Sequence, residues 1–298
     1  MCRHLVIGSA GLIGEHLMRA SINQGLDIIG TDFTYKDPSL FIDIRLRDSI
    51  QTILEKNNPQ IIFLPAAIPN VDYCELNPLE SYSTNVEGVC NVVTAANIIG
   101  AKLVYFSSDY IFDGKSGPYS EVDTPNPINE YGKQKLIAEH YIALHSNNYL
   151  IIRTTIVYGW ESQGKNFICR LLKTLKNKNI LKVPMDQIGN PTYAPNFAEA
   201  VIELVTKGIA GVYHMAGPDR INRYNFACEA AKIFGLGTEF IHPILTADLG
   251  QPALRPLGVG MKVDKAKAVL STQLMGYQEG LRSMATSMHH TIVNNCFN

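Results

Sequence analysis

The sequence predicts an α/β fold, a Rossmann-type doubly wound parallel sheet with a second, smaller substrate-binding lobe. Over the first half of the chain, short apolar runs alternate with longer helical patterns. The runs are apolar throughout, as expected for parallel strands that helices cover on both faces. A glycine-rich turn, GSAGLIG at residues 8–14, follows the first run. These three observations define the fold class.

The elements can be placed in order along the chain. Strands are expected at 4–7, 26–32, 60–65, 102–108 and 149–159. Helices are expected at 12–25, 48–58, 80–100 and from Asn129 onward. Beyond Gly159 the pattern is less regular. Helical stretches at 165–178, 195–207 and 223–235 mix with short apolar runs such as 211–217. We therefore expect two units: a dinucleotide-binding domain of residues 1–160 plus about 196–216, and a substrate-binding lobe of about 161–195 and 217–298.

Composition excludes several classes of function. The 298 residues are 46% hydrophobic and carry a formal net charge of −1, so a nucleic-acid or membrane-surface partner is not expected. No apolar run reaches the roughly 20 residues that span a membrane. The six cysteines form no CxxC pair and the histidines no HExxH array, which indicates reduced thiols, no metal site and a cytoplasmic protein. The tail 271–298 is either a docking helix or a frayed end, and a homodimer is possible.

The glycine turn has the spacing of a dinucleotide site. Gly8 would permit the tight turn, Gly11 would let the backbone approach a diphosphate, and Gly14 would let helix and strand pack closely. Leu12 and Ile13 open the helix whose free N–H groups would hold the diphosphate. A plain glycine-rich turn would show the same spacing. The context favours the cofactor, because Asp32 closes the second strand 21 residues after Gly11.

Asp32 also bears on the choice of cofactor. A carboxylate at the end of the second strand accepts hydrogen bonds from the adenosine ribose and repels a 2′-phosphate, so NAD(H) is favoured. Lys36 lies close enough to leave NADP(H) possible. Asp43 and Ile44 are expected near the adenine, although a solvated loop acid is an equal alternative for Asp43.

The stretch NEYGKQK, residues 129–135, places Tyr131 and Lys135 four positions apart, on one face of the expected helix. The pair is either ordinary surface pairing or a tuned proton donor. A free tyrosine has a pKa near ~10, and lowering it to ~7 takes about 4 kcal/mol. A nearby ammonium favours the phenolate and so lowers that pKa. The glycine turn upstream and Ser108 between favour catalysis.

Several motifs in order resemble the extended short-chain dehydrogenase/reductase superfamily, and within it the dTDP-4-dehydrorhamnose reductase family. The motifs are the glycine turn, SSDYIFDG (107–114), PYSEVDTPNPINEYGKQK (118–135), RTTIVYG (153–159), DQIGNPTYAPN (186–196), GVYHMAGPDR (211–220) and the pair Arg255–Pro256. The resemblance covers nearly the whole chain. It implies reduction of the 4-keto group of a nucleotide-linked 4-keto-6-deoxyhexose by NADH or NADPH.

The resemblance also implies roles for single residues. Tyr131 would be the general acid, Lys135 its partner and a ligand of the nicotinamide ribose, and Ser108 would stand where the family usually has threonine. Contacts to the cofactor are implied for Ala66, Ala67 and Asn85. The stretch departs from the family pattern just before these alanines, where Leu64 and Pro65 replace an asparagine and an alanine.

Substrate contacts are expected from the later part of the chain. Arg255 is the first candidate for the diphosphate, because a guanidinium binds phosphate in bidentate fashion. Asn166 is a further candidate, as are Arg220, Arg223 and Lys165. Trp160 would either stack on a base or sugar or pack at the lobe boundary, and Asp109 would either contact substrate or orient loops.

The leading hypothesis is therefore an NAD(P)H-dependent reductase of a nucleotide-linked, expectedly dTDP-linked, 4-keto-6-deoxy sugar in deoxysugar and cell-surface polysaccharide biosynthesis. A branched or ring-contracted sugar is a variant. The alternative is a cofactor-binding regulatory subunit, because the methionine adenosyltransferase β subunit resembles the same branch. A dehydratase is disfavoured, since the family's Asp-Glu pair after strand four is absent here.

Overall fold

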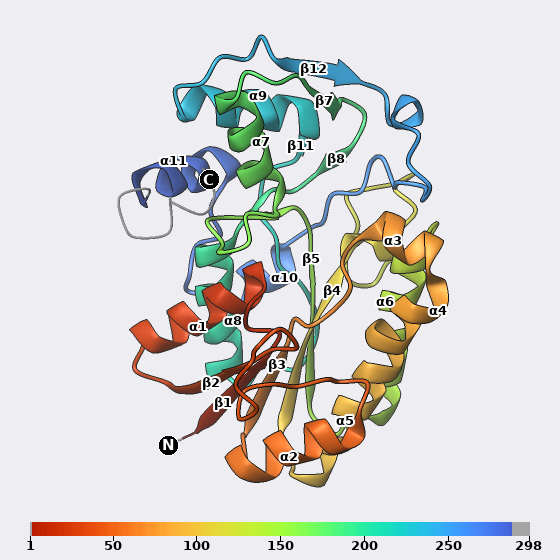
Figure 1. Ribbon diagram of the computed structural model, residues 1–298, viewed down its shortest axis with the longest axis vertical. Helices are drawn as coiled ribbons and strands as arrows, with labels where there is room; N and C mark the ends of the chain where they lie inside the picture. The colour runs from red at the N-terminus through yellow and green to blue at the C-terminus, as the bar shows by residue number, and fades with distance from the viewer. Residues whose placement is uncertain (1, 288–298) are drawn as a thin grey trace.

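The computed structural model describes residues 2–287, which form a parallel six-stranded sheet with a smaller lobe above it (Figure 1). The strand order is β10-β5-β4-β3-β1-β2, and every neighbouring pair is parallel. The strands are β1 (Arg3–Ile7), β2 (Asp27–Thr31), β3 (Ile61–Leu64), β4 (Lys102–Ser108), β5 (Tyr149–Thr154) and β10 (Gly211–His214). The predicted doubly wound sheet is confirmed. The order reverses between β1 and β3, and such switch points bind ligands in open α/β sheets.

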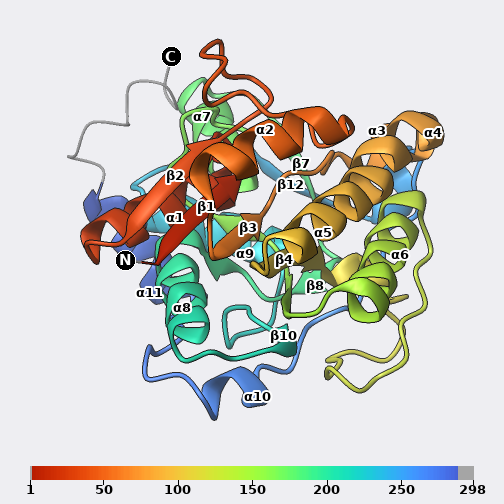
Figure 2. The ribbon, with the colours of Figure 1, turned by 90° about the horizontal axis from the view of Figure 1, so that it is seen from below.

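Helices cover both faces of the sheet, as Figure 2 shows. One face packs against α1 (Leu12–Asn23) and α8 (Ala194–Thr206), in a core that contains Phe106 of β4. The other face packs against α2 (Arg47–Asn57), α5 (Val89–Ile98) and α6 (Glu130–His145), in a core that contains Tyr105. Because both faces are buried, the strands are apolar throughout.

The smaller lobe has its own core, built from α7 (Phe167–Lys176), α9 (Arg223–Ile233) and α11 (Tyr277–Thr286). Its strands are short and pair two by two. They are the parallel pair β7 (Leu181–Pro184) and β12 (Ile241–Ile244), the antiparallel pair β8 (Ile188–Gly189) and β11 (Ile221–Asn222), and the parallel pair β6 (Val157–Tyr158) and β9 (Thr192–Tyr193). This lobe therefore depends on side-chain packing more than on extended strand ladders.

The sequence-based elements need three corrections. The strand expected at 149–159 divides, because Ile156 adopts a positive φ of 42° that ends β5 and turns β6 toward β9. The helix expected at 80–100 comprises α4 (Pro78–Tyr82), a π-helical turn at Ser83–Gly88 and α5, and it follows the short α3 (Val71–Leu76). The chain also returns to the sheet late: the core beside α8 includes Met261, Val263, Ala266 and Leu274 around α10 (Asp264–Lys267).

The tail prediction is resolved only in part. Helix α11 packs Leu281 and Met284 into the core of the smaller lobe, while residues 288–298 lie outside the described residues. Among residues 2–287, no helix combines the length and apolar character needed to cross a membrane.

Candidate active site

A cavity of about 350 Å³ lies at the carboxyl ends of β4 and β5, with residues of the smaller lobe on its far wall. Ser108, Tyr131 and Lys135 all line it. Ser108 is the last residue of β4, and the other two face the cavity from the first turns of α6. That helix begins where predicted, because the Asn129 side chain accepts a hydrogen bond from Gly132 N at 2.9 Å. The three predicted catalytic residues are thus brought together.

Lys135 is almost completely buried, with 4% of its surface exposed. Its Nζ donates to Phe106 O at 2.9 Å and lies 4.7 Å from the centre of the Tyr105 ring and 5.9 Å from that of Tyr131. Burial lowers the pKa of this lysine to about 8, against the attraction of Glu139. The ammonium is therefore easier to neutralise than a surface lysine.

The expected lowering of the Tyr131 pKa does not appear in the described chain. Burial raises the pKa of the phenol well above its ordinary value, and the hydrogen bond with Ser108 only partly opposes this. Desolvation of the phenolate is the largest cause, and the negative charge of Asp109 acts in the same direction. Tyr131 therefore keeps its proton at neutral pH, which is the form that a proton donor needs.

Ser108 belongs to a short chain of hydrogen bonds with Asp109 and Thr155. Ser108 Oγ donates to Asp109 Oδ1 at 3.1 Å, and Thr155 Oγ1 donates to Asp109 Oδ2 at 2.6 Å. Burial raises the pKa of the Asp109 carboxyl to about 6, although both hydroxyls and the charge of Arg223 lower it. Asp109 lines the cavity, but its two oxygens are already engaged.

The glycine turn has the backbone that a diphosphate site requires. Gly8 has φ +100°, and a Cβ there would lie 2.7 Å from Ala66 N. A Cβ at Gly14 would lie 2.2 Å from Gly8 O, so neither position accepts a side chain. Gly11 differs, because the nearest atom to its Cβ position, again Gly8 O, is 3.6 Å away. The protein itself leaves room at Gly11, which fits a backbone kept clear for a ligand.

The residues expected beside this turn lie around it. Leu12 and Ile13 form the first turn of α1, and Ile13 lines the cavity, as does Ala67. Ala66 contacts the turn through the close approach to Gly8. Asn85 is 1% exposed and accepts from Ile68 N while it donates to Gln134. Asn85 therefore anchors the loop after β3 to α6. Its effect on a bound cofactor would come from the position of this loop.

The adenosine end of the predicted site is formed by two acids. Asp32 Oδ2 accepts from Ala10 N at 3.2 Å, and Oδ1 accepts from Thr34 N and Oγ1. Asp43 forms an ion pair with Arg45 at 2.7 Å, and that guanidinium lowers the pKa of the Asp43 carboxyl. Ile44 is buried at 5% exposure and packs against Gly88. Both acids thus also hold their own loops.

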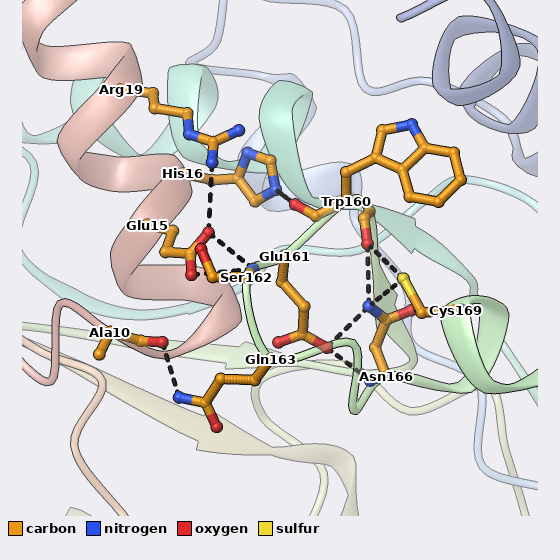
Figure 3. Close-up of polar contacts among 11 residues, drawn as sticks. Ala10, Glu15, His16, Arg19, Trp160, Glu161, Ser162, Gln163, Asn166 and Cys169 are labelled. Atoms are coloured by element: carbon orange, nitrogen blue, oxygen red, sulfur yellow. Dashed lines mark hydrogen bonds and ion pairs between the residues drawn. The ribbon is translucent and has the colours of Figure 1, made fainter. Parts of the chain in front are cut away.

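Figure 3 shows how the loop after β6 spans the two lobes. Gln163 Nε2 donates to Ala10 O of the glycine turn at 2.9 Å, and Ser162 N donates to Glu15 in α1. His16 bonds to Trp160 O at 3.0 Å, and burial lowers the pKa of this histidine to about 4, so the ring is neutral. The loop thus ties the smaller lobe to the start of α1.

Two substrate contacts predicted on this loop are not what the side chains do. Trp160 is 6% exposed, packs edge-on against Phe234, and donates its indole N–H to Met284 O. It therefore has a packing role, in the core of the smaller lobe, whereas the alternative expected packing at the lobe boundary. Asn166 accepts from Cys169 N as the cap of α7 and donates to Gly159 O (Figure 3). Both side chains are used to build the loop.

The arginine on the cavity wall is Arg223 rather than Arg255. Arg255 pairs with Asp72 at 2.7 Å, its side chain is 8% exposed, and it does not line the cavity. Arg223 does line it, bonded to Gln187 Oε1 at 3.2 Å and stacked on Phe167 at 4.6 Å. The sequence named Arg223 only among further candidates, because nothing in a single chain shows which arginine has a carboxylate partner.

Thr155 was missed in the sequence. A usable signal was present, because Ser108 pairs with Thr154 in register, so polar residues at the ends of two adjacent parallel strands meet. Among residues 2–287, no group of three or more His, Cys, Asp or Glu side chains is placed to hold a metal ion.

Together, the sheet, the glycine turn and the Ser-Tyr-Lys set define a dinucleotide-dependent oxidoreductase of the extended short-chain type. The model of the RmlD substrate-binding-domain family matches residues 2–290. A dTDP-4-dehydrorhamnose reductase of Aggregatibacter actinomycetemcomitans is 31% identical over 95% of this chain and 98% of its own length. The chain therefore belongs to this family, as predicted, which confirms an NAD(P)H-dependent oxidoreductase.

Two further comparisons bear on the predictions. The crystal structure of dTDP-4-dehydrorhamnose reductase from Bacillus anthracis in complex with NADP superposes with a TM-score of 0.89, at 28% identity, over 96% of this chain and 100% of that one. The methionine adenosyltransferase 2 subunit β of Bos taurus is 29% identical over 87% of this chain and 84% of its own length. Both branches weighed from the sequence are therefore relatives.

Proposed function

We propose that this protein reduces the 4-keto group of a nucleotide-linked 4-keto-6-deoxy sugar, with dTDP as the expected nucleotide, in the synthesis of a deoxysugar for cell-surface polysaccharide. The observation that carries the proposal is the meeting of Ser108, Tyr131 and Lys135 on one cavity wall, which Ile13 of α1 continues toward the glycine turn. A reductase needs a proton donor within hydrogen-bond reach of the substrate carbonyl, and that carbonyl must also face the cofactor. The cavity has Tyr131 as a candidate donor and extends toward the glycine turn.

Each residue has a defined task in this reaction. The bound cofactor supplies a hydride to C4. Tyr131 gives its proton to the C4 oxygen, which turns the ketone into a secondary alcohol. Ser108 hydrogen-bonds that oxygen. Lys135 binds the nicotinamide ribose, and its positive charge stabilises the Tyr131 phenolate that remains after proton transfer. The residues of the glycine turn hold the diphosphate of the cofactor through backbone N–H groups.

The nucleotide end of the substrate is assigned to the smaller lobe. Arg223 is the cation that lines the cavity there, and its stacking on Phe167 and bond to Gln187 fix the plane of the guanidinium. A planar, oriented guanidinium suits a diphosphate. Arg255 supports the site indirectly, because its pair with Asp72 fastens the segment 253–256 to α3.

We propose NADH as the preferred cofactor. Asp32 directly follows β2 and accepts from Ala10 N of the glycine turn, and a carboxylate beside this turn would repel a 2′-phosphate. Titration of NADH and NADPH against the purified protein by fluorescence tests this. We expect at least about tenfold tighter binding of NADH, a difference of about 1.4 kcal/mol. Asp32→Ser should reduce the preference, whereas tighter NADPH binding by the unmutated protein would show that Lys36 or Arg45 overrides Asp32.

The main experiment measures NADH oxidation with dTDP-4-keto-6-deoxyglucose as substrate. Turnover supports the reductase, and its product identifies the configuration at C4. Cofactor binding without turnover of this or of a branched or ring-contracted keto sugar would favour the regulatory-subunit alternative. A cytoplasmic location and a homodimer remain parts of the proposal, and sedimentation of the purified protein would decide the latter.

A further inference from the structure

Ser108 has one hydroxyl hydrogen, and its polar neighbours determine which role that hydrogen takes. The hydroxyl donates to Asp109 Oδ1 at 3.1 Å, and its oxygen accepts from Tyr110 N at 3.2 Å. A serine hydroxyl has one hydrogen and two lone pairs. The remaining lone pair of Ser108 Oγ can accept from the Tyr131 phenol, which lies within hydrogen-bond reach. In this arrangement Ser108 has no hydrogen left to donate to a keto oxygen.

The carboxyl group of Asp109 holds a second hydroxyl in the same way. Thr155 Oγ1 donates to Asp109 Oδ2 at 2.6 Å, so each oxygen of the carboxylate receives one hydroxyl hydrogen. The three side chains are 7%, 7% and 5% exposed for Ser108, Asp109 and Thr155. Two hydrogens are shared among three side chains while Asp109 is ionised, and both are directed at the carboxylate.

We propose that Asp109 is a positioning residue whose protonation releases the Ser108 hydrogen toward the substrate carbonyl. A protonated Asp109 adds a third hydrogen to the trio. The carboxyl can then donate to Ser108 Oγ and still accept from Thr155, so the Ser108 hydrogen is free to point into the cavity. This inference rests on the proposed function and deepens it, since it explains how Ser108 becomes a donor.

The groups around Asp109 place this exchange in an accessible range of pH. Burial raises the pKa of Asp109 to about 6, and the opposing influences are the Thr155 and Ser108 hydroxyls and the charge of Arg223 from α9. Tyr110 and Tyr131 also face it, and both stay neutral because burial raises the pKa of each phenol. The carboxyl therefore changes state below neutral pH, within the range in which such an enzyme can be assayed.

The test is the pH dependence of kcat with saturating NADH and dTDP-4-keto-6-deoxyglucose, over about pH 5 to 8. The unmutated enzyme should gain about tenfold as the pH falls through the midpoint, since one donor to a developing oxyanion is worth that or more. Asp109→Asn should remove the inflection, because an amide does not titrate and can donate to Ser108 at every pH. Ser108→Ala should also lose it, at a lower rate.

Thr155 separates positioning from a merely structural role. Thr155→Val deletes a hydroxyl that stabilises the carboxylate, so the inflection should move to higher pH, whereas Thr155→Ser should leave it in place. The infrared band of a protonated carboxyl gives a reading that does not depend on turnover. It should titrate with the same midpoint as kcat and vanish in Asp109→Asn.

An inflection that survives in Asp109→Asn, or that does not move in Thr155→Val, would overturn the inference. So would a turnover that does not respond to the carboxyl titration seen in the infrared. Absence of turnover at every pH, with that titration intact, would instead count against the proposed function. Should Asp109→Asn fail to fold, the inference is still tested by the shift of the inflection in Thr155→Val and its absence in Thr155→Ser.

Discussion

The two walls of the cavity are built in different ways. On the sheet side, long parallel strands and backbone conformation place the groups: Ser108 ends β4, and Gly8 turns at φ +100°. On the side of the smaller lobe, strands of two residues carry the wall, and side-chain contacts such as Arg223 with Gln187 fix it. The comparison teaches that backbone conformation positions the proposed catalytic groups, while side-chain contacts position the proposed substrate-binding groups.

The largest effect should come from the backbone of the sheet side. Gly11→Val should abolish measurable binding of NADH in a folded protein, because the protein leaves 3.6 Å at that Cβ position and only a ligand would meet the side chain. Gly14→Ala is the matched control, since its Cβ would lie 2.2 Å from Gly8 O and should lower the melting temperature instead. Fluorescence titration measures the affinity of both variants for NADH, and thermal unfolding measures their stability. Unchanged affinity in Gly11→Val would mean that the cofactor does not bind at this turn.

Loss of the proton donor should come next. Tyr131→Phe keeps the edge-on ring contact with Tyr110 but has no transferable proton. We expect a fall in kcat of about 10²–10⁴-fold, with little change in the affinity for NADH. Steady-state kinetics with the purified variant measure it. Near-normal reduction by this variant would mean that Tyr131 is not the proton donor and that another group supplies the proton.

The same contrast explains what the sequence could reveal. Parallel strands buried on both faces are apolar throughout, and a glycine turn followed by Asp32 has a fixed spacing, so the sheet and the candidate cofactor residues beside it could be predicted from the chain. The YxxxK spacing likewise survives as one helical turn of α6. These signals are local in sequence, which is why one chain sufficed to predict them.

The smaller lobe lacks such local signals. Trp160 is as suitable for stacking on a ligand as for packing on Phe234, and only the fold decides between them. Arg255 and Arg223 are equivalent in sequence, but Asp72, 183 residues from Arg255, neutralises only the former. The pKa of Tyr131 depends on burial from several elements at once. Tertiary contacts of long range therefore account for each of these differences.

Substrate binding should sharpen the comparison further. Arg223→Met should raise KM for dTDP-4-keto-6-deoxyglucose by about 10- to 100-fold, because one charged hydrogen bond is worth roughly 1.5–3 kcal/mol. Arg255→Met should cost less in KM and more in thermal stability, because it removes the ion pair with Asp72 of α3. A larger increase in KM for Arg255→Met than for Arg223→Met would indicate that Arg255 binds the diphosphate.

The last prediction concerns the stability cost of a buried cation on the sheet side. Burial lowers the pKa of Lys135 from 10.5 to about 8, so the unfolded chain binds more protons than the folded one between these values. The contribution of Lys135 to the free energy of unfolding should therefore rise with pH across that window, by up to about 3 kcal/mol at 1.36 kcal/mol per pH unit. Buried thiols and phenols with raised pKa values act in the opposite direction, so the difference between the unmutated protein and Lys135→Met isolates this contribution. Lys135→Met should lack this rise.

At neutral pH the same variant should be more stable than the unmutated protein, by roughly 1–3 kcal/mol, because the bond from Nζ to Phe106 O offsets only part of the desolvation. It should nevertheless bind NADH more weakly and turn over more slowly, since the ammonium that faces Tyr131 is gone. Urea unfolding at about pH 7 and 9.5, beside the NADH titration, measures both. A variant that loses stability together with activity would mean that Lys135 supports the fold. Gained stability with lost activity would mean that Lys135 serves catalysis and that its burial lowers the stability of the folded protein.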